Sequence, residues 1–319
     1  MITLTLAKIP LQKSSQESKL YFLSRIIGLH FWLIFRRFKP SSKEGAGLPP
    51  RAQKTRATVV CPEKLQSLVP FAEHTLRRHG FAVTSEKSEA AESSPLPLVV
   101  GPAALKNPPE GYLAFQLEPL LVSPLLSFSY LNKLLLASSI WDYSLTNTQI
   151  LSALGFDPLK IEHVNICPLD GDGGGGNHLV SFAEREIDVL FFGWAKSDRR
   201  QAALAHLSQN LNLVVVENLF SPEVDSLISK TKVVVNIHFY EGSDLEQVRI
   251  AQCFAEGTPV ISENSEDALN WPHYQAVRFV DSADWEGMVR IAQQLVTSEQ
   301  LWTEQSLASL SSCAKCAHN

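Results

Sequence analysis

The feature that most constrains the fold of this chain is an alternation between short apolar runs and longer amphipathic segments, from about residue 57 to residue 296. Two of these runs are Ile187–Phe192, which reads IDVLFF, and Lys232–Ile237, which holds three consecutive valines. Continuous apolar runs of about four to eight residues are typical of strands buried on both faces, as in parallel sheets covered by helices. Because the runs alternate with helical segments, the sequence predicts a doubly wound α/β protein.

Residues 57–168 are the first of two such regions and predict a Rossmann-like domain with a parallel sheet. Its expected strands are Thr58–Cys61, Phe81–Thr84, Leu98–Gly101, Tyr112–Leu117, Ser139–Tyr143 and Lys160–Cys167. Its expected helices are Lys64–His79, Ser127–Ala137 and Thr146–Leu154. Pro70 predicts a kink or a late start of the first helix, because proline lacks the N–H that an interior helical residue donates.

Residues 187–319 repeat the pattern and predict a second Rossmann-like domain. Its expected strands are Ile187–Phe192, Leu213–Val216, Lys232–Ile237, Pro259–Ser262 and Val277–Val280. Its expected helices are Asp198–Leu211, one that opens at Ser221, Leu245–Glu256 and Asp284–Val296. Between the two regions lies the glycine-rich stretch Asp170–Asn177. A phosphate-binding loop would lead directly into a helix or carry a Lys-Ser/Thr pair, so we interpret residues 169–186 as an interdomain linker.

The first 56 residues predict an apolar helix followed by a linker. Leu20–Phe38 is apolar, but Arg25 interrupts it and the uninterrupted part is shorter than the ~20 residues that a spanning helix needs. Two interpretations stay open: a helix packed on its own protein, or an interfacial helix whose aromatic residues and terminal basic cluster contact a membrane surface. The expected location is cytoplasmic, with peripheral attachment to the inner face of a membrane in the second case.

Composition excludes some classes of protein. The formal charge of -5 argues against a general nucleic-acid binder, so no nucleic-acid partner is expected. The five scattered cysteines indicate a reducing compartment and no disulfide framework. Cys313 and Cys316 lack the second ligand pair of a zinc site, and we interpret them as part of a plain terminal tail. No metal site is expected.

Polar residues gather where the valine-rich strand of the second region ends. His238, Tyr240, Glu241 and Asp244 follow this strand, and the helix Leu245–Glu256 comes next. In open parallel sheets ligands bind beyond the carboxyl ends of the strands, and the positive end of a helix favours anions there. The layout therefore predicts a site for a polar ligand with hydroxyls and an anionic group. Asp244 is also a candidate N-cap of that helix.

The sequence resembles the glycosyltransferases of the two-Rossmann-domain (GT-B) type, in particular their C-terminal nucleotide-sugar-binding half. The likeness rests on VLFFGWAKSDRR at Val189–Arg200, VVVNIHFYEGSDLEQVRI at Val233–Ile250 and AEGTPVISE at Ala255–Glu263. It is looser in the first region, where Tyr112–Glu118 and Ser138–Asn147 carry it. The resemblance implies that residues 57–168 form the acceptor domain and residues 187–319 the donor domain.

The resemblance also implies a diphosphate site at the start of the second domain. Gly193 ends a strand, and Lys196, Arg199 and Arg200 follow within one loop and the first helical turn. Arginine binds a diphosphate with a bidentate fork and lysine binds it as a point charge. The alternative is a solvated basic helix start. The remaining implied donor-binding residues are Tyr240, Glu241, Asp244, Glu246, Arg249 and Gln252.

The family often carries an acidic pair around this loop, and this chain departs from that pattern. By offset from Gly257 the two positions are Asp244 and Gln252. A glutamine can hydrogen-bond a hydroxyl but brings no charge. Glu241, Glu246 and Arg249 are therefore candidates for the missing roles, and a noncatalytic protein on the same fold stays open as an alternative.

Three residues are candidates for catalysis. Glu118 follows a strand of the first domain and Asp142 lies near the end of another. A carboxylate there could act as general base for an acceptor hydroxyl, and each also has a structural interpretation. His238 ends the valine-rich strand of the second domain.

The resemblance implies transfer of a sugar from a nucleotide-diphosphate-sugar donor to an acceptor hydroxyl, on a glycan or a lipid-linked acceptor. The nucleotide sugar is the substrate, and no further cofactor is expected. The alternatives are a noncatalytic nucleotide-sugar-binding or scaffold protein and a sugar-nucleotide epimerase. A dehydrogenase is disfavoured, because no Gly-x-Gly-x-x-Gly follows a first strand.

Overall fold

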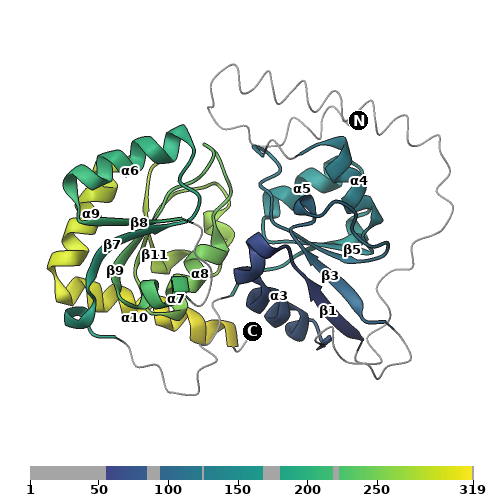
Figure 1. The fold of residues 1–319 in the computed structure, drawn as a ribbon, viewed down its shortest axis with the longest axis horizontal. Helices are drawn as coiled ribbons and strands as arrows, with labels where there is room; N and C mark the ends of the chain where they lie inside the picture. The colour runs from purple at the N-terminus through teal and green to yellow at the C-terminus, as the bar shows by residue number, and fades with distance from the viewer. Residues whose placement is uncertain (1–54, 85–93, 124–125, 168–179, 218–222, 318–319) are drawn as a thin grey trace. The chain divides into compact units, whose positions relative to one another are not determined.

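The computed structural model describes residues 55–84, 94–123, 126–167, 180–217 and 223–317 (Figure 1). The predicted apolar N-terminal helix and residues 169–179 of the predicted interdomain linker lie outside these residues. The chain divides into two compact units, Met1–Val164 (unit 1) and Asn165–Asn319 (unit 2), each of which is described by itself.

Unit 1 is built on one parallel sheet with the strand order β2-β1-β3-β4-β5-β6. The strands are β1 (Arg56–Val60), β2 (Ala82–Val83), β3 (Leu96–Val100), β4 (Leu113–Gln116), β5 (Ser139–Asp142) and β6 (Ile161–His163). The helices are α3 (Val69–Arg78), α4 (Phe128–Leu136) and α5 (Leu145–Ala153). Short 3-10 turns span Glu63–Leu68, Pro102–Ala104 and Pro158–Lys160.

The helices of unit 1 begin where the sequence predicts. The Ser127 hydroxyl accepts a hydrogen bond from the backbone N–H of Tyr130, and the Ser144 hydroxyl accepts one from that of Asn147, so a serine caps both α4 and α5. Proline occupies the first turn of α3, which confirms the late start predicted from Pro70. Helices α4 and α5 bury their apolar faces against β3, β4 and β5.

Unit 2 holds a second parallel sheet with the strand order β11-β10-β9-β7-β8. The strands are β7 (Ile187–Phe192), β8 (Leu213–Val216), β9 (Thr231–Asn236), β10 (Val260–Glu263) and β11 (Val277–Val280). The helices are α6 (Asp198–Asn210), α7 (Glu223–Ser229), α8 (Gln247–Ala255), α9 (Trp285–Thr297) and α10 (Glu299–Ala317). Short 3-10 turns span Phe182–Glu184, Ala268–Asn270 and Tyr274–Ala276.

Two-sided burial explains the three consecutive valines of β9. Val234 packs in the cluster that α7 and α8 form on one face of the sheet, whereas Val233 and Val235 pack in the cluster of α6 and α9 on the other face. Helices cover both faces in this way in Figure 1. Because successive side chains of a strand point to opposite faces, only a continuous apolar run fills both clusters. The prediction of two doubly wound parallel sheets is confirmed.

The strand order of unit 2 locates a topological switch point between β7 and β9. From β7 the chain moves to β8 on one side and then returns to β9 on the other side. The crossovers leave β7 in opposite directions and therefore open a crevice at the carboxyl ends of these two strands. The residues that follow β7 and β9 consequently lie where ligands bind in open α/β sheets.

Three features of the chain differ from the sequence-based expectations. The closing strand expected over 160–167 is short, because only Ile161–His163 pairs with β5. The C-terminal residues continue a helix, α10, where a plain tail was expected. Cys167 is disulfide-bonded although no disulfide framework was expected, whereas Cys61 and Cys253 are free thiols.

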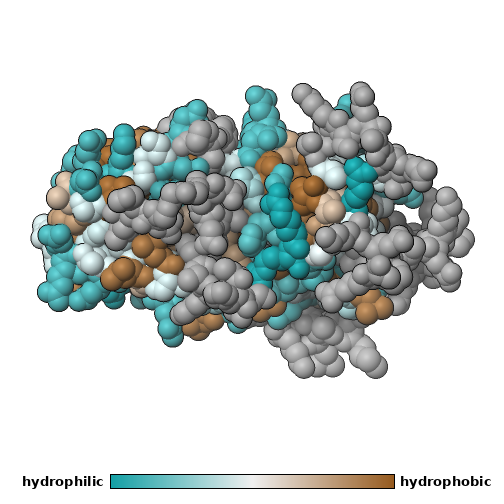
Figure 2. Space-filling view, turned by 90° about the horizontal axis from the view of Figure 1, so that it is seen from below, coloured by the Kyte–Doolittle hydropathy of each residue, from teal (hydrophilic) through white to brown (hydrophobic). Residues whose placement is uncertain are grey.

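The surface of the described residues shows no membrane-spanning element. Among them, no helix is both long and apolar enough to cross a bilayer. On the face drawn in Figure 2, apolar residues lie in small groups between hydrophilic ones. Such scattered exposure of apolar side chains is ordinary for a protein surface.

Candidate functional site

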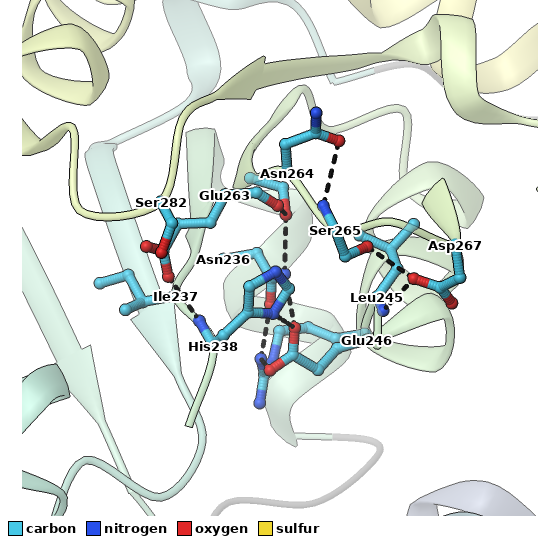
Figure 3. Close-up of polar contacts among 12 residues, drawn as sticks. Asn236, Ile237, His238, Leu245, Glu246, Glu263, Asn264, Ser265, Asp267 and Ser282 are labelled. Atoms are coloured by element: carbon cyan, nitrogen blue, oxygen red, sulfur yellow. Dashed lines mark hydrogen bonds and ion pairs between the residues drawn. The ribbon is translucent and has the colours of Figure 1, made fainter. Parts of the chain in front are cut away.

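A cluster of buried and half-buried polar and charged side chains lies at the carboxyl ends of β7, β9 and β10 (Figure 3). The cluster brings together residues of the segment after β7 with residues that end β9, begin α8 and end β10. Its members are Arg199, Arg200, Asn236, His238, Glu246, Arg249 and Glu263. Five of the sequence-predicted residues of the second domain therefore meet around the switch point between β7 and β9: Arg199, Arg200, His238, Glu246 and Arg249.

Glu246 is the hub of this cluster. Its Oε1 accepts a hydrogen bond from Arg200 Nη2 at 3.1 Å and lies 3.6 Å from Arg249 Nη1. Its Oε2 accepts a hydrogen bond from Asn236 Nδ2 at 2.9 Å and lies 2.7 Å from His238 Nδ1. Burial alone would raise the pKa of Glu246, but the charge and hydrogen bond of His238 and the two arginine charges outweigh it and hold the pKa well below its usual range.

His238 is fixed on one side and has no partner on the other. The side chain is 2% exposed, its Nδ1 contacts Glu246, and its backbone N–H donates to Glu263 Oε2 at 2.8 Å. Its Nε2 is buried and makes no hydrogen bond. Burial lowers the pKa of His238, but the charge and hydrogen bond of Glu246 outweigh burial and raise it. In the protonated ring Nδ1 donates to Glu246, and Nε2 carries an N–H with no acceptor.

Asn236 links Glu246 to Arg249. Its Nδ2 donates to Glu246 Oε2 and also to Ser262 Oγ at 2.9 Å, and its Oδ1 accepts a hydrogen bond from Arg249 Nη1 at 2.6 Å. The side-chain amide thus uses both of its donors and its acceptor. Sequence analysis did not select Asn236, although a polar residue that directly ends a valine-rich strand was a usable signal.

Gly193 is needed for the position of Arg249. A Cβ built on Gly193 would lie 2.7 Å from Arg249 Nη2, and the φ of this glycine is 127°. Any other residue would therefore strain the backbone and displace the guanidinium. The group that approaches Gly193 closely is thus an arginine of the chain itself, and an approach to a ligand stays a prediction.

Arg200 is buried within the site. It is 3% exposed, and its Nε and Nη1 donate to the backbone carbonyls of Ile237 and Trp194 at 2.8 and 2.7 Å. Burial, together with the neighbouring Arg249, lowers the pKa of Arg200 to about 10. The guanidinium is still charged at neutral pH, and it braces the loops that follow β7 and β9.

Arg199 forms a bidentate ion pair with Glu263. Arg199 Nη1 donates to Glu263 Oε2 at 2.5 Å and Nη2 donates to Glu263 Oε1. The carboxylate, which is 0% exposed, also accepts hydrogen bonds from the backbone N–H groups of His238 and Ala283. This geometry gives Arg199 a structural partner, and diphosphate binding by Arg199 stays a prediction.

Lys196 occupies a different environment from the arginines. It is exposed, and its Nζ lies 5.1 Å from the ring centroid of Trp194, itself about half exposed. No ion pair is present for Lys196 in the part of the chain that the structure describes. Ser197 caps α6 by accepting a hydrogen bond from the backbone N–H of Arg200. Lys196 is thus an exposed cation beside the N-terminus of α6.

The loop between β9 and α8 holds the remaining predicted donor residues. Tyr240 packs edge-on against Phe239 at 4.7 Å, and Glu241 is exposed. Helix α8 begins at Gln247 with Glu246 in the N-cap position, so the interpretation of Asp244 as the N-cap is wrong. The cap side chain makes no capping hydrogen bond, because Glu246 is directed to His238 and the arginines.

Gln252 lies inside α8 and is buried, with 9% of its surface exposed. Asp244 is half-buried in the loop that precedes the helix. The carboxylate that lies beside His238 is Glu246. Sequence analysis included Glu246 only as one of several substitutes for the acidic pair.

Asp267 is a buried acid that sequence analysis missed. Its Oδ1 accepts hydrogen bonds from the backbone N–H of Leu245 at 3.0 Å and from Ser265 Oγ at 2.6 Å. Its Oδ2 is buried without a partner, and burial raises its pKa. The residue lies in an irregular segment after β10, where no periodic pattern marks it. Through Leu245 it holds the chain that leads into Glu246.

The two candidate bases of unit 1 lie in one hydrogen-bond network. Asp142 is fully buried, and its oxygens accept hydrogen bonds from Gln116 Nε2, the backbone N–H of Ser144 and Asn147 Nδ2. Glu118 accepts a hydrogen bond from Ser123 Oγ at 3.0 Å, and burial raises its pKa. Asp142 is thus committed to the fold, whereas Glu118 is the better placed of the two to exchange a proton.

Among the described residues there is no group of three or more His, Cys, Asp or Glu side chains that could hold a metal ion.

Comparison with known proteins shows that the fold is shared with glycosyltransferases. No protein-family model and no curated protein matches the sequence. Among solved structures, an alpha-glucosyltransferase in complex with UDP-glucose and DNA has a TM-score of 0.51 at 9% identity, covering 81% of this chain and 94% of that chain. WaaG, a glycosyltransferase involved in lipopolysaccharide biosynthesis, has a TM-score of 0.50 at 9% identity and covers 81% and 95%.

A third solved structure, Anabaena HepE in complex with UDP, has a TM-score of 0.50 at 10% identity, covering 82% of this chain and 95% of that chain. At such identities the similarity shows the fold alone. It confirms the resemblance to the GT-B type at the level of architecture, over most of the chain. Activity has to be argued from the site.

Proposed function

We propose that the protein transfers a sugar from a nucleotide-diphosphate-sugar donor to an acceptor hydroxyl, with the donor bound by unit 2. The proposal is supported by the shared fold, because solved proteins of this fold were captured with UDP or UDP-glucose. It is supported also by the location of the charged cluster at the switch point between β7 and β9, where α/β sheets bind ligands.

The observation that carries the proposal is the buried, unpartnered Nε2 of His238. Buried polar groups in native proteins are almost always hydrogen-bonded, and an exception indicates a missing ligand or water. His238 belongs to a cluster that holds three arginines and two glutamates, so cations outnumber carboxylates around it. An anionic, hydroxyl-bearing ligand such as a nucleotide sugar would supply both a hydrogen-bond acceptor for Nε2 and a negative charge for the surplus of cations.

In this proposal Lys196 and the N-terminus of α6 bind the diphosphate. Lys196 is exposed and makes no ion pair among the described residues, whereas Arg199 and Arg200 are each paired with a glutamate. A point charge beside helical N–H groups stabilises a leaving diphosphate without a metal ion. The loop with Tyr240, Glu241 and Asp244 is assigned to the sugar and the ribose.

Unit 1 is assigned to the acceptor, a glycan or a lipid-linked hydroxyl. Glu118 is the proposed general base, because burial raises its pKa toward the range in which it can exchange a proton. Asp142 holds the local fold by accepting hydrogen bonds from Gln116, Ser144 and Asn147. The Glu118 carboxyl would accept the proton of the acceptor hydroxyl as the glycosidic bond forms.

A second candidate is a noncatalytic nucleotide-sugar-binding protein. Gln252 stands where the resembling family commonly has a carboxylate, and the arginines of the site are already engaged with partners in the chain. This arrangement is compatible with ligand binding without turnover. The two candidates differ in whether a nucleoside diphosphate is released.

The test is a screen of nucleotide sugars for binding by calorimetry and for release of the nucleoside diphosphate. We expect one donor to bind and to be turned over by the wild type, and His238→Gln to lose both properties. The matched control is His206→Gln, because His206 is a half-buried histidine of α6 that pairs with Glu286 and does not belong to the charged cluster. Binding without release supports the second candidate, and absence of binding to any nucleotide sugar contradicts both.

A further inference from the structure

Asn236 is a buried amide whose hydrogen bonds all go to other side chains of the charged cluster or of β10. It is the last residue of β9 and is 0% exposed. Its Nδ2 donates to Glu246 and Ser262, and its Oδ1 accepts from Arg249. A carboxylate and a hydroxyl lie on one side of the amide and a guanidinium on the other, so only one amide orientation satisfies all three partners. The Asn236 side chain is therefore held in one orientation, and it restrains the side chains of Glu246, Ser262 and Arg249.

The carboxylate of Glu246 is fixed from both ends by this arrangement. Asn236 and His238 share its Oε2, while Arg200 and Arg249 lie at Oε1. Rotation of the carboxylate would break the short contact with His238 Nδ1. The imidazole in turn is held by this contact and by the burial of the ring.

We infer that Asn236 and Glu246 are positioning residues that hold the His238 ring with its Nε2 N–H presented to the nucleotide-sugar donor. The inference rests on the proposed function and deepens it. It moves the carboxylate role of the donor site from the positions Asp244 and Gln252 to Glu246, with Asn236 as its support. One nitrogen of the imidazole is bound within the protein, so the other is directed at the ligand.

Several charged groups on the elements packed around His238 influence its pKa. They are Glu246 before α8, Glu263 at the end of β10, Arg199 on α6, and Asp267 after β10. Glu246 is the only one of them in contact with the ring. Its removal should therefore change the titration of His238 more than any other single substitution in this set.

The experiment records the titration of His238 by NMR in the ligand-free full chain, for the wild type and for Asn236→Asp and Glu246→Gln. In the wild type we expect His238 to titrate above its ordinary pKa, in keeping with the raised value that Glu246 causes. Glu246→Gln should lower that pKa. Asn236→Asp places a second carboxylate beside Glu246, so the pair should titrate jointly and add an acidic step to the His238 curve.

The matched control is Asn264→Asp. Asn264 is an exposed amide just after β10 whose Oδ1 accepts a hydrogen bond from the backbone N–H of Ser265. The change adds the same charge near the site without touching the Asn236–Glu246 pair. It should leave the His238 titration and the donor affinity at wild-type values.

Donor binding is then measured by calorimetry with UDP-glucose and, separately, with UDP. Each variant of the pair should weaken UDP-glucose binding by roughly 10- to 150-fold, the loss of one charge-assisted hydrogen bond. Wild-type titration of His238 in a folded Glu246→Gln protein overturns the inference, as does unchanged affinity in both variants. If Asn236→Asp does not fold, Glu246→Gln, which keeps the shape of the side chain, decides by itself.

The failure of the proposed function gives a different pattern. A wild type that binds neither probe contradicts the donor site, while the ligand-free titration still reports whether Asn236 and Glu246 position His238. A wild type that binds both probes, with variants that bind equally well, contradicts only the positioning role.

Discussion

Glu263 provides the sharpest test of how the site is held together. Its buried carboxylate accepts two hydrogen bonds from Arg199 and one each from the backbone N–H groups of His238 and Ala283. Ala283 has a φ of 64°, a left-handed conformation that is uncommon for alanine, and its N–H is directed at Glu263. Glu263 therefore joins the ends of β9 and β10 to the turn before α9.

Glu263→Gln keeps the shape of this side chain but removes its charge. Each carboxylate oxygen faces two donors, so the amide NH2 of glutamine would be directed at one backbone N–H and one guanidinium nitrogen. Arg199 would also lose its counter-charge. Breaking a buried ion pair from one side costs about 3–5 kcal/mol. For a unit of this size the loss corresponds to a Tm decrease of roughly 6–20 °C.

The assay is urea denaturation of the full chain, followed by calorimetry of the transition that belongs to unit 2. The control is Asp188→Asn, which removes the partner of Lys232 from a pair whose side chains are 33% and 18% exposed. Such partly exposed pairs contribute about 1 kcal/mol or less. We expect a large shift for Glu263→Gln, a small one for Asp188→Asn and unchanged m-values in both.

Equal small shifts in the two variants would refute this reasoning, since they would show that Glu263 carries no more than a surface pair does. The same argument applies to Arg199→Ala. Because this substitution leaves Glu263 buried and unpaired, it should lower the stability of unit 2, in addition to any effect on diphosphate binding.

Three further predictions address other parts of the chain. Gly193→Ala should displace the Arg249 guanidinium and weaken nucleotide-sugar binding by about tenfold or more, which calorimetry would detect, and unchanged affinity would mean that Arg249 does not serve the site. The stability of unit 2 should be greatest between about pH 4.5 and 6.5. The lowered pKa of Glu246 stabilises the folded state above the pKa of the unfolded state, and this stabilisation is lost as the pH falls through the folded-state pKa. The raised pKa of His238 stabilises the folded state below about pH 6.5, and this stabilisation is lost as the pH rises through the folded-state pKa. A pH series of denaturation midpoints checks this, and a flat profile in Glu246→Gln is the expected control. Deletion of residues 1–50 should reduce sedimentation with anionic liposomes, and equal sedimentation of both forms would favour a helix packed on the protein.

The sequence predicted the architecture of both units because burial on two faces leaves a local signature. The valine run of β9 and the run IDVLFF of β7 fill clusters on opposite faces of their sheet, and the strand boundaries follow from where these runs stop. Helix α10 was missed because its apolar residues do not form a regular stripe. Its Trp302 and Ser306 contact other elements through hydrogen bonds of their own.

The sequence indicated which strand ends would carry polar side chains, but not the partners of those side chains. His238 follows a strand end and was selected on that ground, whereas Glu246 was selected as a candidate for the missing role of the family's acidic pair. The pairing of Arg199 with Glu263, 64 positions away, depends on tertiary structure that no local pattern reports. Asp244 was chosen over Glu246 by an offset taken from the resembling family, whereas the contacts of this chain place Glu246 beside His238.

The most direct test of the central claim is a structure of the protein solved with a nucleotide sugar. The account predicts that the donor lies at the carboxyl ends of β7 and β9, with an oxygen of the ligand within hydrogen-bond distance of His238 Nε2 and the diphosphate beside Lys196. A ligand bound elsewhere, or one at this site that leaves His238 Nε2 without a partner, would contradict it.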